Sequence, residues 1–359
     1  MILKNLSSLF GHAVDNVPAL NRLRKRIPAA VQDHRRPVSS DAMTAISLLL
    51  LLTAGGAGYV SWAEYRIAQG DPAWWLIAGA PLAYLLPVLL LVSVWFTLSW
   101  IWRTPRPPEY RLGPAACARL FFGEVGAVAL SWPLLILHRG LIRDPGQASA
   151  PLPLLLVHGV LVNDGVWFGL RRDLSRRGLG PVYTINYGPP LADIEHFACQ
   201  LESRIDAICA ATGAARVALI AHSMGGLVAR AYLRRSGAAR VAKLITIGTP
   251  HHGSMLAWTF GGCCLAQMRP GNRWLSALNI DEGGRAPTSM LSIRSRHDSM
   301  VVPQASAELA CARNVALSGI GHNALLNSRD VMDEVARAVA SALADEESGS
   351  VAGAVHHAG

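Results

Sequence analysis

The chain has little charge for its length. Of its 359 residues, 16% are charged and 51% are hydrophobic, which is an apolar composition for a soluble protein. The net charge is +9, but arginine and lysine are scattered or flank apolar stretches, and we find no nucleic-acid-binding motif. We therefore expect no nucleic acid partner, and we attribute the positive charge to contact with a membrane surface.

Cysteine is absent from the spacings that bind metals. None of the six cysteines lies in a C-x-x-C pair, and the adjacent Cys263 and Cys264 do not favour a simple disulfide. We expect free thiols in a reducing compartment, with neither a metal site nor a cofactor. The sequence also lacks an internal repeat, and its first long apolar stretch is too long and too far along the chain for a signal peptide.

Two long stretches contain no charged residue at all. They cover 42–63 and 73–102, and a run of roughly 20 apolar residues can cross a bilayer. Positive residues are frequent before the first stretch and after the second but scarce between them, which predicts a hairpin with both ends in the cytoplasm. We therefore assign a basic N-terminal arm to 1–41 and two transmembrane helices to 42–102.

A third apolar stretch, 120–137, is interrupted by Glu124 and Pro133. A carboxylate within the hydrocarbon of a membrane is costly. We therefore expect a helix that lies on the membrane surface or covers the domain that follows it, within a membrane-adjacent helix and linker over 103–150. The alternative is a third membrane span, which would place the rest of the chain on the opposite side of the membrane.

From residue 151 onward, short apolar runs alternate with helical stretches. This pattern predicts a mainly parallel sheet covered by helices on both faces. We assign an α/β catalytic domain to 151–344 and a disordered tail to 345–359. Its central element is the apolar run 217–221, which is followed by Ser223 and a helical stretch. A strand that turns sharply into a helix would hold the Ser223 hydroxyl at the tip of a strained elbow.

A serine nucleophile needs a base, an acid that orients the base, and donors for the oxyanion. His322 follows a late predicted strand and Asp298 follows the strand before it, so both should lie with the serine at the carboxyl edge of the sheet. The expected oxyanion donors are two backbone N–H groups. One belongs to Met224, directly after the serine, and the other to Val160, in the loop after the first strand.

These features resemble bacterial α/β-hydrolase lipases and esterases of the triacylglycerol-lipase type. The resemblance rests on Ala-His-Ser-Met-Gly-Gly at 221–226, where Ala221 replaces the usual glycine, on His-Gly at 158–159, and on Gly-Thr-Pro-His-His-Gly at 248–253. It covers roughly the last half of the chain. It implies an α/β-hydrolase fold, ester hydrolysis and the serine–aspartate–histidine triad, and it leaves the all-α transmembrane segment outside.

The sequence thus predicts a membrane-anchored serine hydrolase that cleaves carboxylic esters of lipids or other acyl compounds through an acyl-enzyme on Ser223. An acyltransferase or a thioesterase with the same triad is the alternative. We expect an acyl-ester or lipid substrate, contact with membrane lipids, and a multi-pass location in a bacterial inner membrane with the catalytic domain in the cytoplasm. The segment 254–287 is either a cap over the site or a packed insertion.

Overall fold

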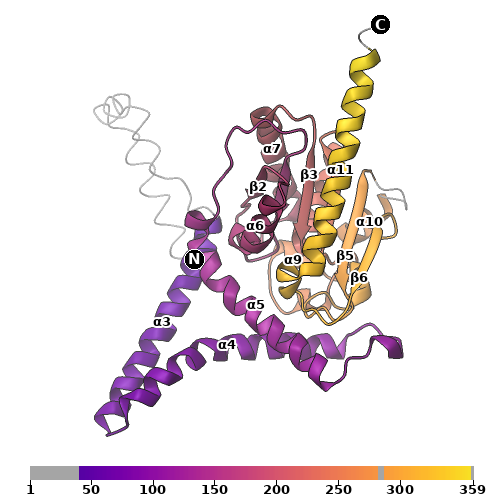
Figure 1. The fold of residues 1–359 in the computed structure, drawn as a ribbon. Coiled ribbons are helices and arrows are strands. Elements are labelled where there is room, and N and C mark those ends of the chain that lie inside the picture. The colour runs from indigo at the N-terminus through magenta and orange to yellow at the C-terminus, as the bar shows by residue number, and fades with distance from the viewer. Residues whose placement is uncertain (1–39, 282–286, 357–359) are drawn as a thin grey trace, which may run out of the picture. The chain divides into compact units, whose positions relative to one another are not determined.

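The computed structural model describes residues 40–281 and 287–356 of the chain. The predicted basic arm lies outside these described residues except for its last two positions, which begin a helix. Figure 1 shows the described elements, which run from long N-terminal helices to an α/β part that ends in a long helix.

Three long helices precede the sheet: α3 (Ser40–Ala68), α4 (Ala73–Ile101) and α5 (Pro114–Leu141). At a rise of about 1.5 Å per residue, helices of this length extend over about 42 Å, which exceeds the roughly 30 Å hydrocarbon core of a bilayer. All three are long and apolar enough to cross a membrane. The sequence predicted two such helices, and α5 meets the same criteria of length and composition.

α5 differs from α3 in how much of it the protein covers. None of the most apolar stretch of α3 is buried, whereas 33% of the corresponding stretch of α5 is buried. α5 packs on α4 through a small valine cluster that includes Val88 and Val128. It also reaches the loops of the α/β part through Glu124. α5 therefore contacts the α/β part, and whether it also crosses a membrane stays a prediction.

Six parallel strands form one sheet in the order β2-β1-β3-β4-β5-β6. Their bounds are β1 (Leu154–Val157), β2 (Val182–Ile185), β3 (Val217–His222), β4 (Val241–Ile247), β5 (Ser289–Ser295) and β6 (Arg313–Leu317). The central β3 is buried along its whole length, as expected for a parallel strand covered on both faces. The predicted α/β class with a mainly parallel sheet is confirmed.

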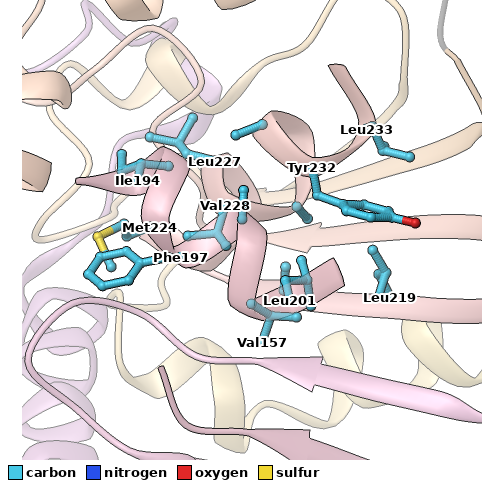
Figure 2. Close-up of a cluster of buried hydrophobic side chains, with 14 of the residues drawn as sticks. Val157, Ile194, Phe197, Leu201, Leu219, Met224, Leu227, Val228, Tyr232 and Leu233 are labelled. Atoms are coloured by element: carbon cyan, nitrogen blue, oxygen red, sulfur yellow. The ribbon is translucent and has the colours of Figure 1, made fainter. Parts of the chain in front are cut away.

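Helices cover both faces of the sheet. α7 (Ile194–Thr212) and α8 (Met224–Ser236) lie on one face, and Figure 2 shows apolar side chains, for example Phe197, that join them to the strands. α6 (Phe168–Arg176) and α11 (Arg329–His356) pack on the other face. Burial of these two apolar clusters supplies the main driving force for folding of the α/β part.

Shorter helical segments lie between the long elements, and most of them lie in the connections between strands. They are η2 (Pro108–Tyr110), η3 (Asp164–Trp167), η4 (Met255–Trp258), α9 (Cys263–Gln267), α10 (Arg273–Asp281), η5 (Gln304–Ala307) and η6 (Ala324–Asn327). Two of them, η5 and η6, follow the loops that carry Asp298 and His322.

The C-terminal segment differs from its prediction. The sequence predicted disorder over 345–359, but α11 continues as far as His356, and 357–359 lie outside the described residues. Alanine and glutamate near this point favour helix. In addition, Glu346 pairs with Arg216, which precedes β3, with 2.5 Å between carboxylate and guanidinium. Small and polar residues predict disorder, and composition alone does not reveal the long-range ion pair that holds this segment.

Candidate active site

Ser223 lies between the end of β3 and the start of α8, where the chain turns sharply. Its backbone has φ 55° and ψ −128°, a positive φ that is uncommon for a residue with a side chain. β3 is paired with a strand on each side, and the Ser223 N–H donates to the carbonyl of Ile247 at 2.9 Å. The sheet therefore holds the sharp strand-to-helix turn that was expected at this serine.

Two glycines after the serine allow α8 to approach the sheet closely. A Cβ added at Gly225 would lie 2.3 Å from the carbonyl oxygen of Val157, and one added at Gly226 would lie 2.1 Å from Thr249 Oγ1. Both distances are too short for any side chain. Ala221, which stands where glycine was expected, is fully buried in the apolar cluster under α7 and α8, so its methyl group is accommodated.

Asp298 and His322 form a buried pair at the same edge of the sheet. Their side chains are 1% and 2% exposed, and His322 Nδ1 lies 3.0 Å from Asp298 Oδ2. The other carboxylate oxygen accepts from the N–H groups of Met300 and Val301, each at 2.8 Å. Burial opposes the charged form of the imidazole, but Asp298 by charge and hydrogen bond, together with the charge of Glu124, raises the pKa of His322.

His222, the last residue of β3, lies beside His322 but is suited to a different role. The two ring centroids are 4.6 Å apart, and His222 Nε2 lies 3.3 Å from the backbone carbonyl of His322. Burial and the neighbouring His322 keep the pKa of His222 well below its ordinary value. His222 is therefore a neutral donor that supports the His322 loop.

A carboxylate from α5 joins the loops that carry the aspartate and the histidine. Glu124 is fully buried. It accepts from the Ser299 hydroxyl at 2.8 Å, from the backbone and side-chain N–H groups of Asn323 at 3.0 and 2.9 Å, and from the Ala324 N–H at 3.0 Å. A Cβ at Gly321 would lie 2.3 Å from this carboxylate, so a side chain there would displace it. Sequence reasoning weighed Glu124 only as an obstacle to a membrane span.

α4 holds the aspartate loop in a similar way. The Ser99 hydroxyl donates to the backbone carbonyl of Asp298 at 2.9 Å. The Gln304 side chain donates to both of these oxygens, at 2.9 and 3.0 Å, and accepts from the Thr104 N–H. Glu124 is the only charged residue of the apolar stretch 120–137, and this is the signal by which the sequence could have identified it. Ser99 carries no such signal, because Ser93 and Thr97 lie close to it in the same stretch.

A cavity of about 610 Å³ opens in front of Ser223, within the range of about 300–1,000 Å³ that is usual for ligand pockets. Ser223, His222, His322 and Val160 line it together. A Cβ at Gly159 would lie 3.0 Å from that of Ser223, so the loop before Val160 passes directly over the serine. Met224 begins α8 immediately behind it. The structure thus brings together all five residues that the sequence selected.

The segment after β4 forms part of the cavity wall. Leu256 in η4, Phe260, Leu265 in α9 and Met268 line the cavity. Phe260 is also largely exposed, as is Trp258. Leu265 and Met268 also belong to the apolar cluster under α7 and α8, so a cap and a packed insertion both stay predictions for this segment. Over 40–281 and 287–356, no group of three or more His, Cys, Asp or Glu side chains is arranged to hold a metal ion.

Comparison with known proteins points to lipases over the α/β part. A family model described as a PGAP1-like alpha/beta domain matches residues 183–340. A triacylglycerol lipase of Burkholderia plantarii is 33% identical over 154 residues, which are 37% of this chain and 42% of that protein. A triacylglycerol lipase of Pseudarthrobacter phenanthrenivorans is 37% identical over 118 residues, 31% of this chain and 36% of that protein.

The chain has an α/β-hydrolase fold. The parallel sheet, the sharp turn at Ser223 and the family match to an α/β domain agree on this. A mature lipase from Bacillus licheniformis gives a TM-score of 0.45 at 20% identity and covers 51% of this chain and 90% of that one. The chain spans less than half the length of either triacylglycerol lipase, and α3 to α5 lie outside the family match.

Proposed function

We propose that this chain is a serine hydrolase that cleaves carboxylic esters of lipids or other acyl compounds. The observation that carries the proposal is the buried Asp298–His322 pair, whose histidine lines one apolar cavity together with Ser223. The two triacylglycerol lipases that are similar to the α/β part support ester bonds as the target. An acyltransferase or thioesterase would use the same residues, and the acceptor of the acyl group distinguishes these reactions.

In the proposed reaction, His322 Nε2 takes the proton of the Ser223 hydroxyl while the Oγ atom attacks the ester carbonyl carbon. Asp298 holds Nδ1, so Nε2 remains available to face the serine. The N–H groups of Met224 and Val160 donate to the oxyanion. His322 then gives its proton to the leaving alcohol. Water attacks the acyl-enzyme in the same manner, which releases the acid and restores Ser223.

The reaction can be tested on the whole protein purified in detergent. It should hydrolyse p-nitrophenyl esters, and a fluorophosphonate probe should attach to the peptide that contains Ser223, because a probe of this kind requires an activated serine. Product analysis with an added alcohol then separates hydrolysis from acyl transfer. Absence of ester turnover, or a probe attached to another residue, would contradict the proposal.

We further propose that α3 and α4 anchor the enzyme in a bacterial inner membrane, with the α/β part in the cytoplasm. Their apolar side chains support this: for example, Leu50 and Ile77 are 65% and 74% exposed. The positive residues on the outer sides of the hairpin support the orientation. In this arrangement α5 lies against the α/β part, where Glu124 finds its partners.

The orientation predicts the behaviour of alkaline phosphatase fusions, since that reporter is active only outside the cytoplasm. A fusion after Gly70, between α3 and α4, should be active, whereas a fusion after Arg143 should be inactive. The measurement is phosphatase activity per amount of fusion protein in intact cells. Strong activity of the Arg143 fusion would place the α/β part on the opposite side and make α5 a third span.

A further inference from the structure

The long N-terminal helices supply much of the wall of the active-site cavity. Five of the lining residues come from α3, two from α4 and four from α5. They include Ser47 of α3, Leu91 and Trp95 of α4, and Ser131 and Trp132 of α5. The catalytic Ser223 and His322 line the same space. The reacting serine is therefore continuous with a surface built from helices that are apolar enough to cross a membrane.

Each helix turns one stripe toward this space. On α4, Leu91 and Trp95 line the cavity, and Ser99, one turn further, contacts the Asp298 loop. On α5, Glu124 contacts both loops, and Val128, Trp132 and Leu135 line the cavity. These spacings of three and four residues mark a single helix face. Val128 and Leu135 are seven residues apart on α5, so the part of the groove between them is about 10 Å long.

The opposite faces of the same helices carry exposed apolar side chains. Leu50 on α3, Leu90 on α4 and Leu130 on α5 are 65%, 60% and 54% exposed, which is the pattern of a surface that contacts lipid. Among the described residues that line the cavity, none is Asp, Glu, Lys or Arg. The groove thus suits an uncharged apolar chain.

We propose that α3, α4 and α5 form the acyl-chain site, and that the substrate is an ester with a long acyl chain that enters from the bilayer. This inference rests on the proposed ester hydrolase function. The acyl chain of the substrate passes from membrane hydrocarbon into the apolar groove without crossing water. The groove then places the ester carbonyl next to Ser223. The helices are then part of the substrate site in addition to being an anchor.

A matched pair of variants on α5 tests the proposal. Ser131 lines the cavity, whereas its neighbour Leu130 points outward and is exposed. Ser131→Trp should fill the groove and lower kcat/KM for p-nitrophenyl palmitate by at least about tenfold, since even a single methylene in an apolar pocket changes kcat/KM by about 10–200-fold. The loss should be much smaller for p-nitrophenyl butyrate, whose short acyl chain reaches less far along the groove. Leu130→Trp should leave both rates unchanged.

A second pair on α3, Ser47→Trp against Leu50→Trp, repeats the comparison at a position that is not packed between helices, in case Ser131→Trp disturbs folding. The proposal is overturned if cavity-facing variants keep the palmitate rate, or if both of them lower the two rates equally. Failure of the proposed function itself looks different, because the wild-type protein would then hydrolyse neither ester and would not react with the fluorophosphonate probe.

Discussion

Replacing Ser223 with alanine should lower kcat for ester hydrolysis by about 10⁶-fold, the scale of loss when a serine nucleophile is removed. Without its Oγ atom the acyl-enzyme cannot form, and only the oxyanion donors and the binding groove remain. The fold should persist, because alanine and serine meet the same steric conditions at φ 55° and the Ser223 side chain fills no apolar core. The measurement is kcat with p-nitrophenyl butyrate, accompanied by thermal unfolding.

The control for Ser223→Ala is Ser203→Ala. Ser203 is exposed on α7 and does not line the cavity. Its hydroxyl donates to the carbonyl of Cys199 within the helix. This variant should keep the wild-type rate, which shows that loss of a serine hydroxyl alone is harmless. If Ser223→Ala retained a rate within tenfold of wild type, the nucleophile would have to be another residue.

Replacing Glu124 with alanine should lower kcat by about 100-fold, the cost of a displacement of roughly 1 Å at a catalytic group. Its carboxylate accepts from Ser299, Asn323 and Ala324, which adjoin the loops of both Asp298 and His322. Each donor left unpaired in a buried site costs about 1–3 kcal/mol, so the loops should shift and thermal stability should fall as well. The variant should lower kcat but change KM little, since Glu124 does not line the cavity and so does not contact the substrate.

Glu124→Gln separates the charge of this residue from its hydrogen bonds. Glutamine keeps an acceptor oxygen and the shape of the side chain, so the loss in kcat should be smaller than in Glu124→Ala. The negative charge of Glu124 favours protonated His322 and raises its pKa, in addition to the effect of Asp298, while the adjacent His222 stays neutral. Without that charge the pKa of His322 should fall. Because the base acts in its neutral form, the acid limb of kcat/KM should move to lower pH.

The matched control is Glu109→Gln, which removes an exposed carboxylate from η2 and should leave the pH profile unchanged. A purely structural role for Glu124 would reduce activity without moving the acid limb. If the acid limb of Glu124→Gln stays in place, the charge of Glu124 does not raise the pKa of His322. That result would contradict the proposed electrostatic role even if the rate dropped.

The parts of the site that the sequence predicted are those that follow from chain order. A strand, a serine and a helix at 217–230 are local features, and Asp298 and His322 each follow a strand, so the direction of a parallel sheet places them at one edge. Glu124 and Ser99 escaped prediction because they meet their partners across 199 residues of chain. No local pattern records which distant loop a buried carboxylate will contact.

The cavity was likewise beyond the reach of sequence reasoning. Charge-free stretches such as 73–102 identify helices that are suited to a membrane, but they do not show that Trp95 and Ser131 face the same space as Ser223. The tail was mistaken for a similar reason, since its composition is small and polar whereas the contact between Glu346 and Arg216 is long-range. Periodicity in the sequence predicts helices and strands, but the packing between distant helices and strands determines the cavity that they form.

The contacts of Ser99 and Glu124 also affect the order in which the active site folds during synthesis. Synthesis proceeds from the N-terminus, so α4 and α5 leave the ribosome well before the loops of Asp298 and His322, which bind to them. The last loops of the active site are thus completed on helices that are already in place. We expect a newly made chain to stay inactive until these helices and loops have assembled.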